Sequence, residues 1–112
     1  MSIIEKYETT RKGFWDYLGE VGETNEIFQE HYTKSYAPGI ISAKNKRLMG
    51  MVGAAVAGCE GCMLGQVTHA IAEGATRAEI VEACAVAFSL GGTMAGSKIS
   101  LIIQFMDEKE IK

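Results

Sequence analysis

Residues 58–79 read GCEGCMLGQVTHAIAEGATRAE, and this stretch decides the fold. Gly58 ends one helix, because glycine readily adopts the left-handed conformation found just past a helix C-terminus. Apolar residues at helical spacing then predict a second helix from about Cys59 to Glu73, which Gly74 terminates. The stretch therefore predicts consecutive helices joined by short turns.

The next helix has the clearest start signal in the chain. Thr76 and Glu79 have the S/T-x-x-E spacing of a capping box, in which each side chain accepts a hydrogen bond from a backbone N–H at the helix start. An apolar stripe continues this helix up to Gly91-Gly92, which interrupts it. A last helix is expected over about residues 93–107.

The N-terminal half shows the same helical spacing. Aromatic-rich stripes predict helices over about residues 4–19 and 25–36, and Ala37-Pro38-Gly39 ends the second because proline cannot continue a helix. Ser42 is expected to cap a helix over residues 43–57. Almost no alternating β-branched segments are present, so the prediction is an all-α bundle of about six helices in one domain, residues 1–112.

Composition limits the classes of function. A chain of 112 residues with 47% hydrophobic content has the size of one domain with a modest core. Its formal net charge is −3, and its lysines and arginines are scattered among acidic residues, so no basic face for nucleic acid is expected. No nucleotide-binding loop, dinucleotide fingerprint or Ser-His-Asp arrangement is visible, and we expect no cofactor.

The protein is expected to act in the cytoplasm, without a membrane partner. Residues 1–6 lack the basic and apolar regions of a signal peptide. The uncharged stretch from Leu48 to Cys59 is shorter than the roughly 20 apolar residues that a spanning helix needs. Three cysteines are an odd number and too few for a secreted disulfide scaffold.

The cysteine pair carries the chemistry that the sequence predicts most directly. Cys59 and Cys62 are spaced as CxxC at a helix start, where free N–H groups and the helix dipole favour a thiolate, the attacking species in disulfide exchange. Cys84 lies on the apolar stripe of a later helix and is interpreted as core filler. Zinc needs four ligands, whereas the pair and His69 supply three, so no metal site is expected.

The CxxC at 59–62, Gly74-Ala75-Thr76 with Glu79-Ile80, and Gly91-Gly92 together resemble the carboxymuconolactone decarboxylase superfamily, in its alkylhydroperoxidase D-like branch. The resemblance covers roughly residues 36–105. It implies an antiparallel helical bundle assembled as trimers or hexamers. It also implies that Cys62 is the attacking thiol and that Cys59 resolves the mixed disulfide.

Two positions depart from the peroxidases of this family, which place a glutamate twelve residues before the first cysteine and a histidine four residues after the second. Arg47 and Gln66 occupy these positions, and neither is a base near neutral pH. His69, two helical turns after Cys62, is a candidate substitute through a bridging water or the Gln66 amide. Arg47 could instead stabilise a thiolate by its charge, if the preceding helix folds back antiparallel.

The sequence thus predicts a cytoplasmic thiol-disulfide oxidoreductase, acting as a disulfide reductase. Its predicted site residues are Cys59, Cys62, His69, Gln66 and Arg47. Its predicted partners are a thiol electron donor and a disulfide or peroxide substrate. Three alternatives stay open: a hydroperoxide reductase that uses His69, a non-enzymatic redox-sensitive oligomeric scaffold, and a lactone decarboxylase. Small residues in the later helices and a limited core predict an oligomer, which the resemblance sharpens to a homotrimer or homohexamer.

Overall fold

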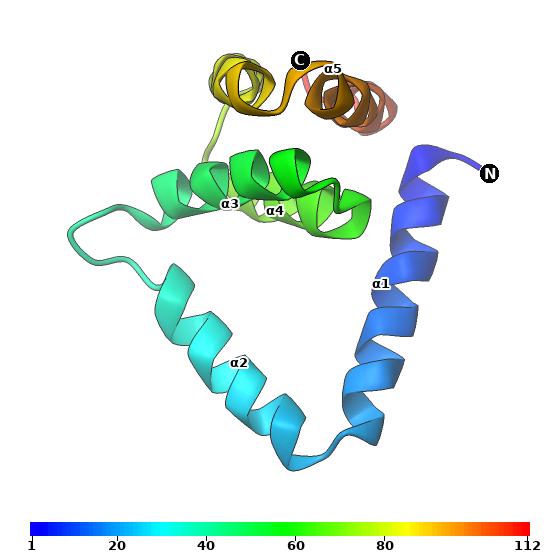
Figure 1. The fold of residues 1–112 in the computed structure, drawn as a ribbon, viewed down its shortest axis with the longest axis vertical. Coiled ribbons are helices and arrows are strands. Elements are labelled where there is room, and N and C mark those ends of the chain that lie inside the picture. Colours follow the sequence, from blue (N-terminus) through cyan, green and yellow to red (C-terminus); the bar gives the residue numbers. More distant parts are fainter.

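A computed structural model describes residues 1–112 as five helices without strands (Figure 1). The helices are α1 (Ile3–Glu20), α2 (Glu23–Tyr36), α3 (Ala43–Ala57), α4 (Glu60–Ala72) and α5 (Arg77–Glu108). The prediction of an all-α fold is confirmed, and α3 has the predicted bounds. α4 begins one residue later than predicted, because Cys59 is its N-cap rather than its first helical residue.

The last two predicted helices share the label α5 and meet at a kink at Gly92. Gly92 has φ 61° and ψ −148°, a conformation that is essentially restricted to glycine, so the predicted break is real. α5 therefore consists of two helical segments that fold back on each other, since Arg77 Nη1 at its start lies 2.8 Å from Asp107 Oδ1 near its end. The five labelled helices thus contain the six predicted helical segments. The predicted capping box is present: the Thr76 N–H donates to Glu79 Oε1 at 3.0 Å, and the Glu79 N–H donates to Thr76 Oγ1 at 3.1 Å.

The core lies between the α3–α4 hairpin and α5 (Figure 1). Gly58 has the left-handed conformation, with φ 79°, and reverses the chain so that α3 and α4 lie side by side. The largest side chains without exposed surface all come from these three helices: Met51, Met63, Val67, Ile80, Ile102, Phe105 and Met106. Buried alanines such as Ala55 and Ala87 let the helix backbones approach closely.

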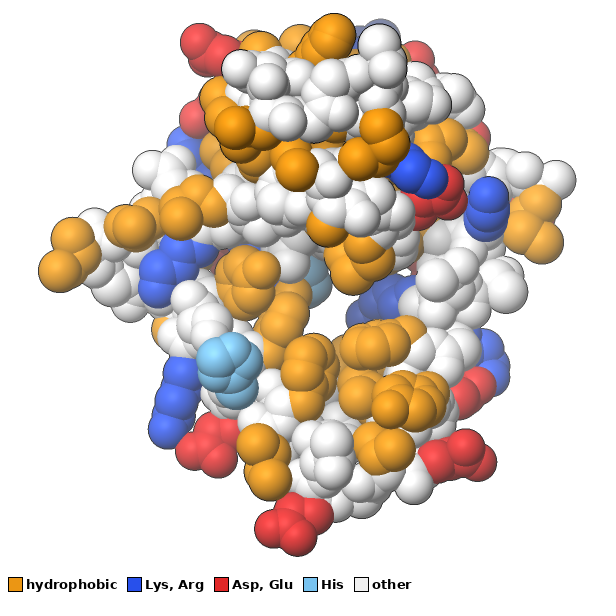
Figure 2. Space-filling view, in the orientation of Figure 1, with side chains coloured by type: hydrophobic (Ala, Val, Ile, Leu, Met, Phe, Trp, Pro, Cys, Tyr) orange, Lys and Arg blue, Asp and Glu red, His pale blue; other side chains and the backbone are white.

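α1 and α2 form an arm that stands away from this core between two points of contact (Figure 1). Tyr7 of α1 packs edge-to-face on Phe105, with ring centroids 5.5 Å apart. α2 contributes no buried residue, and its C-terminal end lies against α3 and α4 through Tyr32 and Tyr36. The space-filling view shows an opening between the arm and the core (Figure 2).

α5 is long and apolar enough to cross a membrane by length and composition alone, a feature that the expectation based on residues 48–59 overlooked. Gly92 divides its 32 residues into two segments of about half that length. Each segment is shorter than the roughly 20 residues that a spanning helix needs. α5 also leaves large apolar side chains exposed along the chain: Val81, Val86, Phe88, Leu90 and Met94.

Candidate redox site

The two cysteines of the CxxC motif are paired at the start of α4, as the sequence predicts. Cys59 and Cys62 form a disulfide with their Cα atoms 5.3 Å apart. Cys59 is the N-cap of α4, and its Sγ accepts a hydrogen bond from the Cys62 N–H at 3.3 Å. Cys62 is exposed whereas Cys59 is half-buried. An outside thiol or disulfide therefore has better access to Cys62.

Glu60, between the two cysteines, ties the start of α4 to two other helices. Its carboxylate accepts a hydrogen bond from Lys98 Nζ of α5 at 2.8 Å and lies 3.7 Å from Lys6 Nζ of α1. The hydrogen bond from Lys98 is the main cause of the lowered pKa of Glu60. These ion pairs fix the orientation of the turn that carries the cysteines. Sequence reasoning missed both lysines, because they are remote from the motif along the chain.

Arg47 and Gln66 meet, and two tyrosines from α2 complete what we call the Arg47 cluster, namely Tyr32, Tyr36, Arg47 and Gln66. Arg47 Nη1 donates to the Tyr32 hydroxyl at 2.6 Å and to Gln66 Oε1 at 3.2 Å. Gln66 Nε2 donates to the Tyr36 hydroxyl at 3.0 Å and to the Tyr32 hydroxyl at 3.3 Å. The buried Gln66 side chain, one helical turn after Cys62, thereby forms hydrogen bonds through both its oxygen and its nitrogen.

The guanidinium of Arg47 also packs on the tyrosine rings. Its Cζ lies 4.0 Å from the centroid of the Tyr36 ring and 5.2 Å from that of Tyr32, both within the range of cation–π attraction. Tyr32 and Tyr36 are themselves the end of an aromatic ladder that continues through Phe28 to Phe14 of α1. Arg47 is therefore no ordinary solvated charge, because aromatic rings and hydroxyls surround it.

His69 does not join the Arg47 cluster or the cysteines. The residue is exposed, and none of the hydrogen bonds of the cluster or of the cysteines involves its side chain. Partial loss of solvation disfavours the charged imidazolium and lowers the pKa of His69, and repulsion from Arg47 and Arg11 lowers this pKa further. His69 is thus neutral near pH 7 and able to accept a proton, yet it stays two helical turns from Cys62, roughly 10 Å along the axis.

Cys84 is buried in the core, in agreement with its interpretation as core filler. Burial raises the pKa of its thiol to about 11, so it carries almost no thiolate at neutral pH. No group of three or more His, Cys, Asp or Glu side chains is arranged to hold a metal ion.

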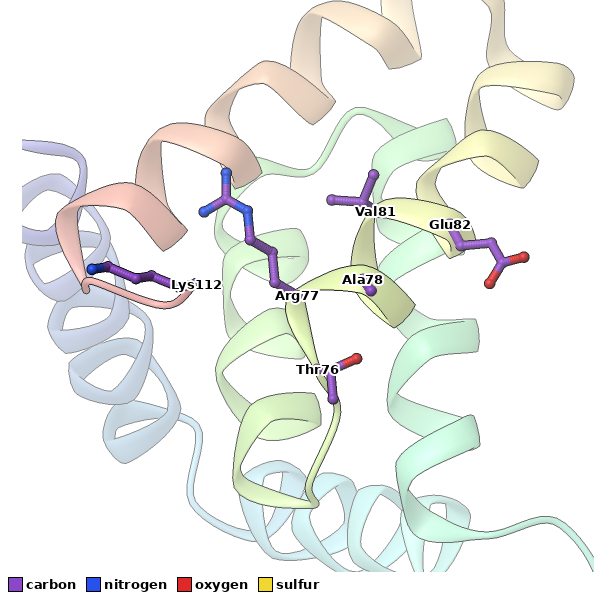
Figure 3. A pocket seen from close by; sticks show the side chains of 6 residues that line it. All are labelled: Thr76, Arg77, Ala78, Val81, Glu82 and Lys112. Carbon is purple, nitrogen blue, oxygen red and sulfur yellow. The ribbon is translucent and has the colours of Figure 1, made fainter.

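A depression at the start of α5 shares no residue with the redox site. Figure 3 shows the side chains that line it: Thr76, Arg77, Ala78, Val81, Glu82 and Lys112. Arg77 points toward the end of α5, where its Nη1 lies 2.8 Å from Asp107 Oδ1. The depression contains no cysteine and no residue of the Arg47 cluster, so it carries none of the predicted chemistry.

The fold and the site together define an all-α protein with a CxxC pair at the N-terminus of a core helix. Residues 22–101 match the carboxymuconolactone decarboxylase family, and the chain belongs to this family. The predicted resemblance is therefore confirmed. No curated protein matches the chain significantly in sequence.

Solved structures of other family members share the fold. A carboxymuconolactone decarboxylase family protein of Thermotoga maritima, with a suggested role in an antioxidative response, is 26% identical. Two crystal structures of it align with TM-scores of 0.83 and 0.84, covering 94% and 95% of this chain and 90% and 94% of theirs. A family member from Legionella pneumophila, 20% identical, aligns with a TM-score of 0.83 over 94% of this chain and 95% of its own.

Proposed function

We propose that this protein is a thiol-disulfide oxidoreductase that uses Cys59 and Cys62, acts as a disulfide reductase and works in the reducing environment of the cytoplasm. The observation that carries the proposal is the pairing of an exposed Cys62 with an N-capping Cys59 at the start of α4. Membership of a family with a suggested antioxidative member adds support.

The reductive half-reaction needs only the two cysteines. The Cys62 thiolate attacks one sulfur of the substrate disulfide, forms a mixed disulfide and releases the other sulfur as a thiolate. The Cys59 thiolate then attacks Cys62 Sγ, forms the Cys59–Cys62 disulfide and releases the second substrate thiolate. Two electrons have then moved from the protein dithiol to the substrate.

A thiol donor returns the protein to the dithiol state. A donor thiolate attacks the exposed Cys62 Sγ, and Cys59 leaves as a thiolate whose sulfur accepts the Cys62 N–H. A leaving thiolate that is stabilised at a helix N-terminus departs more readily. A second donor thiolate then attacks the mixed disulfide, releasing the Cys62 thiolate and the oxidised donor.

The test combines thiol titration with turnover of a small disulfide. We expect two titratable thiols to disappear on oxidation, while Cys84 reacts only after unfolding because its pKa is about 11. The wild type should reduce the disulfide with a thiol donor present, and the double variant Cys59→Ser/Cys62→Ser should not. Equal turnover by the double variant would refute the proposal, and oxidation without any turnover would instead favour the redox-sensitive scaffold.

Peroxide reduction receives less support. A hydroperoxide relay needs a base within hydrogen-bond reach of the attacking thiol, directly or through one water. Gln66 holds the position one turn after Cys62 and is engaged with Arg47 and the tyrosines. The hydrogen bond found at Cys62 joins its N–H to Cys59 Sγ and does not involve His69. We therefore expect peroxidase activity to be weak or absent.

We also propose that the protein assembles as a homotrimer or homohexamer. The exposed apolar side chains of α5, among them Leu90 at 71% exposure, form a surface that a second copy of the chain would cover. We expect Leu90→Glu to shift the sedimentation coefficient toward that of a monomer, because it places a charge in this surface. Gln104→Glu adds the same charge at an exposed polar position of α5 and should leave assembly unchanged. A wild type that sediments as a monomer at micromolar concentration would disprove the assembly.

A further inference from the structure

The Arg47 cluster has more hydrogen-bond donors than acceptors. An arginine can only donate, so Gln66 must turn its oxygen toward Arg47. The Gln66 nitrogen then faces the tyrosines and donates to both hydroxyl oxygens. Each hydroxyl oxygen is therefore an acceptor in this network, and neither hydroxyl donates a hydrogen bond within it.

Arg47 adds further donors of its own. Both hydrogen bonds of the Arg47 side chain are made by Nη1. The edge of the guanidinium formed by Nε and Nη2 therefore has no partner. Such an edge binds a carboxylate through two parallel hydrogen bonds. The chain has three arginines; Arg77 pairs with Asp107, whereas Arg47 and Arg11 have no carboxylate partner.

Two arginines also act electrostatically on α4 at His69, three residues after Gln66. Arg11 of α1 and Arg47 of α3 both act electrostatically on His69 of α4, and Glu73 is the acidic residue that acts in the opposite direction. Tyr36 stays protonated, because burial and the neighbouring Tyr32 raise the pKa of its hydroxyl. In a chain with a formal net charge of −3, this is a local excess of positive charge and free donors.

We propose that the Arg47 cluster binds a carboxylate group of the substrate, so that the enzyme acts on small disulfides that carry a carboxylate near their sulfur atoms. The Nε/Nη2 edge of Arg47 would hold the two carboxylate oxygens, and the hydroxyl of Tyr36, whose ring packs on the guanidinium, would donate to one of them. The Tyr32 hydroxyl stays bonded to Nη1 on the opposite side of the guanidinium and orients it. Gln66 positions these groups and lies one turn after Cys62, with Cβ atoms of such a pair roughly 5–6 Å apart. A carboxylate two or three carbon atoms from the sulfur fits this spacing.

The reduction of such a disulfide rests on the proposed function, whereas binding of its carboxylate does not require reactive cysteines. Two disulfides of similar size separate the contributions: 3,3′-dithiodipropionate carries carboxylates, and 2-hydroxyethyl disulfide is neutral. Each rate is divided by the rate of the same disulfide with dithiothreitol. We expect the wild type to have a kcat/KM about tenfold or more higher for the acidic disulfide than for the neutral one. The reason is that hydrogen bonds to a charged group contribute more than hydrogen bonds between neutral groups.

Arg47→Met should remove this preference, and Tyr36→Phe, which deletes only a hydroxyl, should reduce it. Arg77→Met removes an arginine that already has a carboxylate partner and should leave the preference unchanged. Circular dichroism verifies that each variant is folded, and Tyr36→Phe keeps the test decisive if Arg47→Met is not. An unchanged preference in Tyr36→Phe and in a folded Arg47→Met would overturn the carboxylate site.

Calorimetry with suberate, a dicarboxylate in which two methylenes replace the sulfurs, measures binding without any exchange reaction. The variant Cys59→Ser/Cys62→Ser should bind suberate but not octane-1,8-diol, and adding Arg47→Met should abolish the binding. If neutral disulfides are reduced but suberate does not bind, the carboxylate site is wrong and the proposed function stands. If suberate binds but no disulfide is reduced, the proposed function is wrong and the site stands. Displacement by an equal concentration of inorganic phosphate would overturn the assignment to a carboxylate.

Discussion

Cys62→Ser is expected to lower disulfide turnover by roughly 100-fold or more, because it removes the sulfur that we propose as the nucleophile of the exchange. Cys59→Ser should behave differently. This variant keeps the exposed Cys62 but lacks the thiol that resolves the mixed disulfide. It should therefore complete one attack, release one equivalent of substrate thiol and stop.

Mass spectrometry of each variant after incubation with the substrate measures this asymmetry. Cys59→Ser should carry the mass of one substrate thiol on Cys62, and a thiol donor should remove it. Cys84→Ser is the control, since its side chain lies in the core and takes no part in exchange. The opposite pattern, with the adduct on Cys59 in the Cys62→Ser variant and none in Cys59→Ser, would make the N-capping sulfur the nucleophile.

Gly50→Ala is expected to disrupt the Arg47 cluster without touching either cysteine. A Cβ atom at Gly50 would lie 2.8 Å from the Tyr36 hydroxyl oxygen and 2.9 Å from Gln66 Cδ, so one of these side chains must move. Overpacking of this kind costs about 1–3 kcal/mol, which exceeds the gain of roughly 0.5–1 kcal/mol that alanine brings to a helix interior. We expect a net loss of about 1 kcal/mol in the free energy of unfolding and a loss of the preference for acidic disulfides.

Gly53→Ala is the matched control on the same helix. No atom lies within 4 Å of a Cβ built at Gly53, so only the gain in helix propensity remains, about 0.5–1 kcal/mol. Urea unfolding of both variants measures the two effects with opposite signs. Equal stabilisation by both substitutions would show that Tyr36 and Gln66 do not pack against Gly50 in solution.

Local signals in the sequence were sufficient to predict most of the helices. Ser42 caps α3, Gly58 ends it, and the capping box starts α5, each through interactions between residues that are close along the chain. The break expected at Gly91-Gly92 is present as the kink at Gly92, but the sequence there does not indicate that the two segments fold back on each other. Nothing in the spacing of apolar residues indicated that α2 would bury no residue, because burial depends on how the arm is placed relative to the core.

The site was predictable only in part, for the same reason. The CxxC pair is local, and Arg47 and Gln66 were found through their positions relative to it. The sequence places Tyr32 and Tyr36 in the predicted helix over residues 25–36, and their hydroxyls become part of a site only when α2 meets α3 and α4. Lys98 is separated from Glu60 by 38 residues, and only the packing of α5 on α4 brings them together.

The N-cap at Cys59 links the folding of α4 to the reduction potential of the protein. In the disulfide the Cys59 sulfur caps the start of α4, and as a thiolate it would accept the Cys62 N–H more strongly than a disulfide sulfur does. By thermodynamic linkage, a change that stabilises this cap more in the dithiol than in the disulfide favours the dithiol. It raises the reduction potential of the cysteine pair by about 30 mV for each 1.4 kcal/mol of difference. A substitution that merely alters how α4 begins can thus change which thiol donors are able to reduce the Cys59–Cys62 disulfide.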